Sequence, residues 1–303
     1  MLNFKNIEIS DKEIIEKIAN KYGEKSSQHG FSSMFCLKDK YNDKYCIIDE
    51  YLYVLRSNLE DENYRIYLFP LGDYNNTLGI IKAVNNILDD AKSHGKKVSF
   101  VTVTENAKNI LETNFESKFG IIEDRDSFEY IYDLNKFARL PGGSLARIRN
   151  HVNKFYRQYE GRFVVKKIIP YMKDELFDVY DKWASTHDKI EKGLLDEYNG
   201  IKRGLEYFDD LNLIGVSLYI DNKMEGFVYG ARVSDNTFDL MIEKANTEIE
   251  NSFKVLNKEL GKYLLNDFTY LNYEEDVGKL GLREVKTRYQ PDILLKKYII
   301  KEI

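Results

Sequence analysis

Apolar and polar residues follow two rhythms along this chain, one typical of strands and one typical of amphipathic helices. Residues 64–69 and 97–103 are short, apolar and rich in β-branched or aromatic side chains, which predicts strands. Between them, residues 77–93 repeat apolar side chains at the spacing of one helical face, which predicts a helix packed on those strands. The first half of the chain continues with a short helix at residues 105–116, a turn at 118–120 and a closing strand at 128–134.

The same order of elements returns in the second half, offset by about 170 residues, which is the pattern of a weak internal repeat. Residues 238–242 and 268–273 have the pattern of strands on either side of a helix at 252–265. A hairpin precedes them at 214–220 and 224–233, and a helical turn and a closing strand follow at 280–287 and 294–300. The chain is therefore predicted to form an α/β fold, with helices packed on mixed sheets in two similar lobes.

The predicted lobes meet at residues 140–144, Leu-Pro-Gly-Gly-Ser, where proline and paired glycines stop one element and the serine can cap the next. This divides the chain into an N-terminal lobe, residues 1–139, and a C-terminal lobe, residues 140–303. The helix expected at 145–159 has one apolar face. The opposite face carries Arg147, Asn150, Lys154 and Arg157. Such a stripe is typical of a solvated surface and equally typical of a contact with phosphate or RNA.

The composition is that of a soluble globular protein. Of the 303 residues, 43% are hydrophobic and 31% are charged, which excludes global disorder. The formal net charge of −5 argues against a protein coated in basic surface. Residues 136–167 differ from the rest, because they hold nine basic side chains and one acid. A polyanion or a phosphate ester is expected to dock at this segment, if anywhere.

The sequence has no pattern typical of a membrane span, a signal peptide, a disulfide framework or a zinc site. No window approaches the ~20 apolar residues of a membrane span, and the N-terminus lacks the apolar core of a signal peptide. We therefore expect a cytoplasmic protein. Cys36 and Cys46 cannot form a disulfide framework and have no Cys or His partners at zinc spacing, so we expect two buried free thiols and no metal site.

Charged residues are crowded near the C-terminus, after the strand expected at 268–273. Three acids, residues 274–276, follow that strand directly, and Arg283 and Lys286 come soon after. Open α/β sheets place their sites where strands end, so this crowding predicts a functional site there. A solvated loop also carries acids, and on charge alone that alternative stays open.

Several motifs occur in order along the chain and together carry a family resemblance. They are Arg149-Asn-His-Val-Asn-Lys-Phe155, Phe227 with Gly230, Glu243-Lys-Ala-Asn246, Asn272-Tyr-Glu-Glu-Asp-Val-Gly278, Gly281-Leu-Arg283, Lys286 and Tyr289-Gln-Pro291. In this combination the chain resembles a bacterial family related to the C-terminal domain of phosphatidylglycerol lysyltransferase. The resemblance covers nearly the whole chain, is clearest over residues 142–298, and is more specific than any single motif because several agree in order.

The resemblance implies a fold and a class of reaction. The implied fold is a tandem GNAT fold, in which two lobes similar to acyl-CoA N-acyltransferases lie in one chain. The implied reaction moves an aminoacyl group from aminoacyl-tRNA to an acceptor, which we expect to be a small molecule, a peptide or a lipid headgroup. Because the histidines have no Ser or Cys partner at a recognisable spacing, we expect direct attack by the acceptor, without a covalent enzyme intermediate.

Aminoacyl transfer needs a base for the nucleophile, a donor for the oxyanion and acids that bind an α-ammonium group. Glu243 and Glu274 suit the acid or base role and Arg283 suits the oxyanion, so these three are the expected catalytic residues. The expected substrate-binding residues are Arg147, Arg149, Asn150, Lys154, Lys244, Asn272, Glu275, Asp276, Lys286 and Tyr289. Two alternatives stay open: Glu243 with Lys244 as an exposed pair, and Arg283 with Asp276 as a structural salt bridge.

One departure from the CoA-dependent pattern bears on the cofactor. GNAT proteins that use acetyl-CoA hold its pyrophosphate on a glycine-rich turn at a helix N-terminus. The matching turn, residues 246–251, has no glycine and holds Glu248 and Glu250, which would repel a pyrophosphate. We therefore expect no required cofactor and disfavour acetyl-CoA or another acyl-CoA. The alternatives are a CoA-dependent N-acetyltransferase and a non-catalytic module that binds RNA or another anion.

Overall fold

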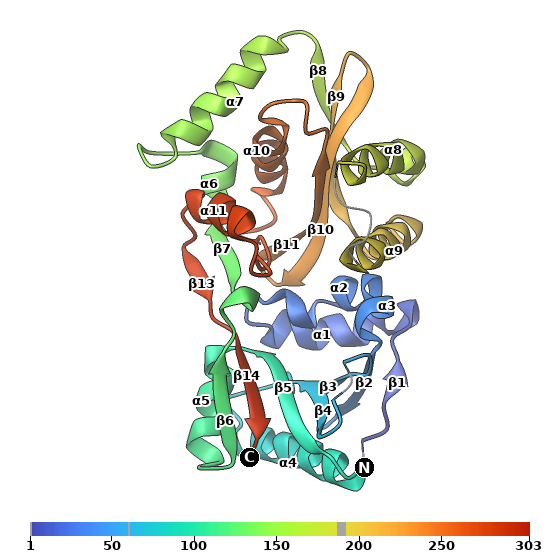
Figure 1. Cartoon of the computed structure of the whole chain (residues 1–303), viewed down its shortest axis with the longest axis vertical. Helices are drawn as coiled ribbons and strands as arrows, with labels where there is room; N and C mark the ends of the chain where they lie inside the picture. The colour runs from blue at the N-terminus through green and yellow to red at the C-terminus, as the bar shows by residue number, and fades with distance from the viewer. Residues whose placement is uncertain (1, 60, 187–191) are drawn as a thin grey trace.

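The computed structural model describes residues 2–59, 61–186 and 192–303, and its strands form two seven-stranded sheets (Figure 1). The first sheet has the order β1 (Lys5–Asn6), β2 (Asp43–Ile48), β3 (Tyr51–Arg56), β4 (Tyr64–Leu68), β5 (Lys97–Val103), β14 (Tyr298–Glu302) and β6 (Phe119–Glu123). Only β4 and β5 pair in parallel among these described strands; the other neighbours are antiparallel.

The second sheet repeats this plan. Its order is β13 (Ile293–Leu295), β7 (Glu129–Asp133), β12 (Tyr270–Asn272), β11 (Thr237–Ala245), β10 (Lys223–Ser234), β9 (Ile214–Ile220) and β8 (Phe163–Lys167). Here β11 and β12 form the parallel pair, and the described neighbours on both sides are antiparallel. Each lobe is thus a mixed sheet built around one parallel pair.

Helices cover both sheets and fill the space between them (Figure 1). The first sheet carries α4 (Thr77–Ser93) and α5 (Glu105–Asn114). The second sheet carries α6 (Leu134–Arg139), α7 (Ala146–Gln158) and α10 (Ser252–Leu264) on one side, with α8 (Lys173–Ala184) on the other. Between the sheets lie α1 (Lys12–Tyr22), α2 (Phe31–Cys36) and α3 (Lys38–Tyr41). Helices α2 and α3 contact α9 (Lys192–Glu206), and α11 (Leu280–Arg288) follows β12.

The helical faces expected from the sequence are present. Helix α4 begins at a cap, because the Asn76 side chain accepts a hydrogen bond from the Gly79 amide at 3.0 Å. Its apolar face is buried against the first sheet. Helix α7 likewise buries Ile148, Val152 and Phe155 in the core of the second lobe. The polar face of α7 stays exposed, so the predicted amphipathic helix is confirmed.

The two sheets exchange strands. Strand β7 comes before the predicted boundary at residues 139 and 140, yet it pairs with β12 and β13 in the second sheet. Strand β14 comes from the end of the chain and lies between β5 and β6 in the first sheet. The single strand expected at 294–300 is therefore two strands in different sheets, and the turn expected at 118–120 leads directly into β6. The two free thiols are present and buried, as expected.

A buried ion pair fixes the point where the exchanged strands cross. The Lys297 ammonium lies 3.0 Å from the Glu129 carboxylate, and both side chains are fully buried. Glu129 also accepts hydrogen bonds from the Ser27 hydroxyl at 2.9 Å and from the Asn272 amide at 2.8 Å. The Lys297 ammonium donates a further bond to the Ser26 hydroxyl at 2.5 Å. A buried pair is stable only when such bonds satisfy it, so this network ties the two lobes together.

Candidate active site

The candidate site lies where β11 and β12 separate. The two strands run in parallel over three residue pairs, the last of which joins Asp239 to Asn272. Strand β11 then continues to Ala245, while the chain after β12 leaves the sheet through left-handed backbone at Glu274, with φ of 54°. The Asn272 side chain supports this turn by accepting a hydrogen bond from the Glu274 amide at 2.7 Å. The two parallel strands thus separate at their carboxyl ends, which is where open α/β sheets place their binding sites.

Glu243 lies at this opening, near the end of β11. One carboxylate oxygen accepts a hydrogen bond from the Tyr273 hydroxyl at 2.5 Å. The other oxygen is buried and has no hydrogen-bond partner among the described residues. Burial raises the pKa of Glu243 to about 7, against the opposing effects of the Tyr273 bond and of Lys244. Near neutral pH this side chain therefore populates both protonation states, as a general base requires.

The groups around Glu243 hold it in place. The Tyr273 hydroxyl accepts a hydrogen bond from the Asn257 amide at 3.2 Å. Burial raises the pKa of Tyr273, so the hydroxyl stays protonated and donates a hydrogen bond to Glu243. The Lys286 ammonium donates to the carbonyl oxygens of Tyr273 at 2.5 Å and Glu275 at 2.6 Å. Lys286 is itself buried, which lowers its pKa. It fixes the loop after β12.

A cavity of about 770 Å³ lies beside this loop, between the two lobes. The second lobe contributes Trp183, Glu197, Lys244, Glu274, Glu275 and the α11 residues Gly281, Leu282 and Val285. The first lobe contributes Met34, Tyr41, Asp43 and Arg56, among others. Glu243 itself does not line this cavity within the described structure. It is adjacent along β11 to Lys244, which does line the cavity.

The second-lobe wall of the cavity is strongly charged. Lys244 pairs with Glu197 at 3.0 Å, and its ammonium lies 3.7 Å from the centre of the Trp183 ring. Burial raises the pKa of Glu274, and the nearby Asp239 raises it further. Asp239 is buried and accepts a bond from the Ser33 hydroxyl at 3.1 Å, while its second oxygen has no partner in the described part of the chain. Among these acids, Glu197 and Glu274 line the cavity and can accept hydrogen bonds from a cation, whereas Asp239 does not line it in the described structure.

Asp239 was not among the residues expected from the sequence. The signal was present, because an acid stands in the strand segment between Phe238 and Leu240, both of which are buried. A carboxylate at the buried centre of a strand needs a partner or a function.

Arg283 and Asp276 form the ion pair that the sequence left as an alternative. The guanidinium donates to both Asp276 oxygens at 2.9 Å and to Asp126 at 2.8 Å. Burial raises the pKa of Asp276, but hydrogen bonds from Arg283 and Tyr130 more than offset this, so its pKa lies below the ordinary value. Neither Arg283 nor Asp276 lines the cavity in the region the structure describes. The catalytic role of Arg283 stays a prediction.

Tyr289 is also set apart from the cavity. It is buried, and its ring stacks on Phe137 with a centroid distance of 4.6 Å. Its hydroxyl is buried without a hydrogen-bond partner among described residues. The position of Tyr289 is typical of core packing, and its expected part in substrate binding stays a prediction.

The basic residues of α7 lie apart from the cavity. Arg147, Asn150 and Lys154 are exposed on the outer face of the helix, and Lys154 pairs with Glu250 at 2.6 Å. Arg149 instead donates to the Leu140 carbonyl at 2.6 Å and stiffens the junction between the lobes. The structure thus gathers Glu243, Lys244, Asn272, Glu274, Glu275 and Lys286 around the strand opening. A role for the α7 face in binding substrate stays a prediction.

The turn between β11 and α10 keeps the two acids noted in the sequence. Glu248 pairs with Lys182 at 2.8 Å, and Glu250 pairs with Lys154. The helix starts at Asn251 in left-handed backbone, with φ of 70°, and the side chain of that residue makes no cap. The disfavoured role of acyl-CoA stays a prediction. Across the described ranges, no group of three or more His, Cys, Asp or Glu side chains is arranged to hold a metal ion.

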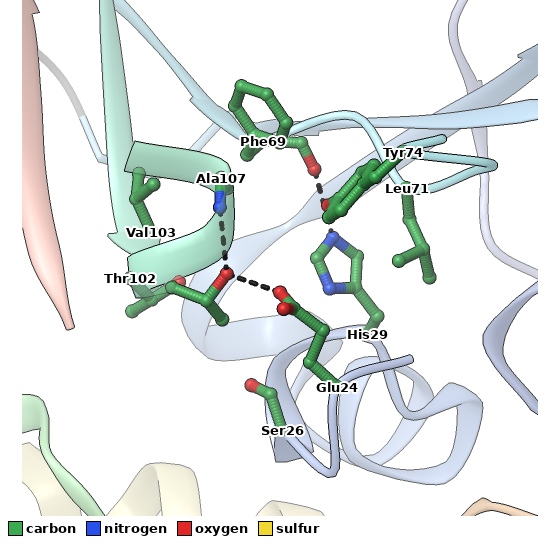
Figure 2. Close-up of a pocket in the computed structure, with 10 residues that line it drawn as sticks. Glu24, Ser26, His29, Phe69, Leu71, Tyr74, Thr102, Val103 and Ala107 are labelled. Atoms are coloured by element: carbon green, nitrogen blue, oxygen red, sulfur yellow. Dashed lines mark hydrogen bonds between the residues drawn. The ribbon is translucent and has the colours of Figure 1, made fainter. Parts of the chain in front are cut away.

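The first lobe has an equivalent opening, which is filled (Figure 2). Strands β4 and β5 pair in parallel as far as Leu68 and Val101, and left-handed backbone follows at Thr102, with φ of 52°. The cavity there measures only about 10 Å³. The His29 ring bonds to the Phe69 carbonyl at 3.1 Å and burial lowers the pKa of His29 to about 4.

A carboxylate also lies in this first-lobe opening, and its hydrogen bonds are satisfied. Glu24 accepts bonds from the Thr104 hydroxyl and from the Asn106 amide. Thr104 in turn caps α5 by accepting a bond from the Ala107 amide at 3.4 Å. The first-lobe opening therefore has neither the space nor the free acceptors found in the second lobe.

The chain is similar to known proteins over most of its length. The family described as "Phosphatidylglycerol lysyltransferase, C-terminal" matches residues 19–301. An uncharacterised protein of Mycoplasmoides gallisepticum is 25% identical over 192 residues. That match spans 62% of this chain and 61% of the relative, which is less than two thirds of the relative's length.

Solved structures share the fold over the whole chain. A conserved protein of unknown function from Bacteroides thetaiotaomicron is 26% identical, with a TM-score of 0.94 and complete coverage of both chains. The structure described as L-PGS from Bacillus licheniformis has a TM-score of 0.65 at 15% identity, and the match covers 96% of this chain and 92% of that one. Tandem GNAT proteins have the same architecture, which confirms the predicted fold class. Within the described ranges, no helix is both long and apolar enough to cross a bilayer.

Proposed function

This chain belongs to the family of phosphatidylglycerol lysyltransferase C-terminal domains, and from that membership we propose that it transfers an aminoacyl group from aminoacyl-tRNA to an acceptor by direct attack. The observation that carries the proposal is Glu243. It is a carboxylate at the opening between parallel strands, with one free buried oxygen and a pKa raised to about 7. Such a group is suited to accept a proton near neutral pH.

The proposed reaction breaks one bond and forms one. The acceptor amine or hydroxyl attacks the carbonyl carbon of the aminoacyl ester, so that a new bond from that carbon to nitrogen or oxygen forms. Glu243 takes the proton that the nucleophile loses. The ester carbon–oxygen bond then breaks, and the proton passes from Glu243 to the leaving ribose oxygen. Tyr273 positions Glu243 through the hydrogen bond of 2.5 Å.

Acids near the opening are proposed to bind the α-ammonium group of the donor. Glu274 and Glu275 line the cavity, and Asp239 keeps one free buried oxygen among the residues described. A desolvated ammonium group needs such acceptors, because an unpaired charge is costly to bury. The exposed basic face of α7 is proposed to contact the tRNA backbone, where each neutralised phosphate makes binding more dependent on salt.

The test uses the purified protein with a set of radiolabelled aminoacyl-tRNAs and three acceptor classes: free amino acids, short peptides and phosphatidylglycerol vesicles. The expected result is loss of label from tRNA that depends on both the protein and an acceptor. If no donor is deacylated with any acceptor, the proposal is overturned. A parallel incubation with acetyl-CoA distinguishes the alternative N-acetyltransferase, since that enzyme would acetylate the amine acceptors without tRNA.

A further inference from the structure

A second charged pair lies on the first-lobe side of the cavity. Asp43 on β2 and Arg56 on β3 are directly opposite each other in the register of the two strands. The carboxylate lies 3.4 Å from the guanidinium Nε, and both residues are buried, at 3% and 5% exposure. Both also line the cavity of about 770 Å³. The two charges therefore face the same cavity as Lys244, Glu274 and Glu275.

The pair lacks the hydrogen bonds that a buried ion pair normally has. Both carboxylate oxygens of Asp43 and the Nε of Arg56 are without a hydrogen-bond partner among the residues described. Burial raises the pKa of Asp43, against the opposing charge of Arg56. Buried charges without hydrogen bonds are unfavourable, and they call for a reason. The comparable pair Glu129–Lys297 is fully hydrogen-bonded, so the fold is able to satisfy such a pair where its role is structural.

Arg56 is nevertheless held firmly. Its Nη2 donates to the Gln28 side chain at 2.8 Å, and its guanidinium lies 4.1 Å from the centre of the Tyr41 ring. These contacts fix the plane of the guanidinium while leaving part of its donor edge unused. Preorganised groups with unused hydrogen-bonding capacity are what a binding site presents before its ligand arrives.

We propose that Asp43 and Arg56 form a subsite for an α-amino-acid head group, with the ammonium on Asp43 and the carboxylate on Arg56. The ammonium group needs acceptors and the carboxylate needs a planar donor, and this pair supplies both side by side. The pair has no net charge, so it suits a zwitterion better than an anion such as a phosphate ester. This assignment rests on the proposed function. The acceptor is then a free amino acid, or a peptide with such a head group, and its side-chain amine or hydroxyl is the nucleophile.

Calorimetric titration of the unmodified protein with the proteinogenic L-amino acids tests the subsite. The tightest binder is then compared with its N-acetyl form and with its amide form. Each capped form is expected to bind at least about tenfold more weakly, because each leaves one buried charge unpaired. The subsite is overturned if no amino acid binds at about 10 mM, or if both capped forms bind as well as the free zwitterion.

Two variants assign the two halves of the head group. Asp43→Asn is expected to bind the free and N-acetylated ligands equally, and Arg56→Gln is expected to bind the carboxylate and amide ligands equally. The control is Asp49→Asn, which removes a carboxylate from an exposed pair with Lys82 outside the cavity, and it is expected to keep the affinity within about twofold. If both cavity variants keep the full discrimination, the assignment is wrong. Should either variant fail to fold, the capped ligands on the unmodified protein decide.

The transfer assay separates this inference from the proposed function. If the protein binds amino acids through Asp43 and Arg56 but never deacylates aminoacyl-tRNA, the transferase proposal fails and the subsite stands. If phosphatidylglycerol vesicles accept the aminoacyl group while no amino acid binds, the subsite fails and the transferase stands.

Discussion

In the first lobe β4 and β5 separate after Leu68 and Val101, and in the second lobe β11 and β12 separate after Asp239 and Asn272. Left-handed backbone follows in both places and a helix comes next in both. The contents differ, because the first opening is packed with side chains around about 10 Å³ of space, whereas the second adjoins a cavity of about 770 Å³.

The comparison shows that the backbone plan alone does not make a site. Glu24 in the first opening has hydrogen bonds to both oxygens, while Glu243 in the second keeps one buried oxygen free among the residues described. Burial acts in opposite directions on the titratable groups, lowering the pKa of His29 to about 4 and raising that of Glu243 to about 7. The unused buried acceptor, together with a raised pKa, distinguishes the candidate site from the packed opening.

The largest expected effect comes from exchanging the two carboxylates for amides. Glu243→Gln removes the proposed base and should lower transfer by at least about 100-fold, the usual contribution of general base catalysis. Glu24→Gln, in the packed opening, should leave transfer within about twofold. Single-turnover release of label from aminoacyl-tRNA measures both. Equal losses in the two variants would mean that the openings do not differ in function.

The next largest effect is expected at the buried pair Glu129–Lys297, which joins the two lobes. Lys297→Ala leaves Glu129 buried without its counter-charge and should lower the free energy of unfolding by about 3–5 kcal/mol. Lys82→Ala breaks only an exposed pair with Asp49 and should change the free energy of unfolding by less than about 1 kcal/mol. Chemical denaturation followed by circular dichroism measures both. A small effect of Lys297→Ala would show that the lobes are held together by other contacts.

The pH dependence of stability should have opposite signs at the two openings. The pKa of Glu243 rises from 4.5 to about 7 on folding, so its contribution is fully present below pH 4.5 and is lost as the pH rises through 7. The pKa of His29 falls from 6.5 to about 4, so its contribution is present above pH 6.5 and is lost as the pH falls toward 4. Each shift corresponds to about 3 kcal/mol.

Two variants measure these contributions by denaturation across the pH range. Glu243→Gln should be more stable than the unmodified protein at pH 8 and similar to it at pH 4. His29→Gln should lose less stability than the unmodified protein between pH 6.5 and pH 4. Parallel pH profiles in all three proteins would contradict the assigned pKa directions. Transfer itself should rise with pH through about 7, as Glu243 loses its proton.

The smallest effect concerns the outer surface of the second lobe. Lys154→Ala removes one exposed cation from α7 and should weaken tRNA binding by a few-fold, with a smaller salt dependence. Its effect on the free energy of unfolding should stay below about 1 kcal/mol. Lys82→Ala on the first lobe is the matched control and should leave tRNA affinity unchanged. Filter binding at several salt concentrations distinguishes the two surfaces.

The fold could be predicted from the sequence where periodicity decides the structure. The apolar faces of α4 and α7 follow from spacing alone, and the order of elements around the two parallel pairs follows from the repeat. The strand exchange could not be predicted in this way. Strands β7 and β14 are short and suit either sheet, so their pairing depends on tertiary contacts such as Glu129 with Lys297.

The candidate site was predictable only in part for a similar reason. Glu243 and Glu274 were found because they stand at strand ends within a recognisable motif. Asp43 and Arg56 were missed because nothing local distinguishes charged residues of an exposed strand from those of a buried strand. Asp239 was missed although it stands between two apolar residues of a strand. Their significance comes from burial and from missing partners in the described structure, which arise from the approach of segments far apart in the chain.

The position of β14 also has a consequence for biosynthesis. Residues 298–302 fill an interior place between β5 and β6, although both neighbours leave the ribosome well before them. Until residues 298–302 have been synthesised, the nascent first lobe carries two unpaired strand edges, and such edges invite association with other chains. Completion of the first sheet therefore waits for synthesis of the second lobe, so a product truncated before β14 would keep an open sheet and be prone to aggregate.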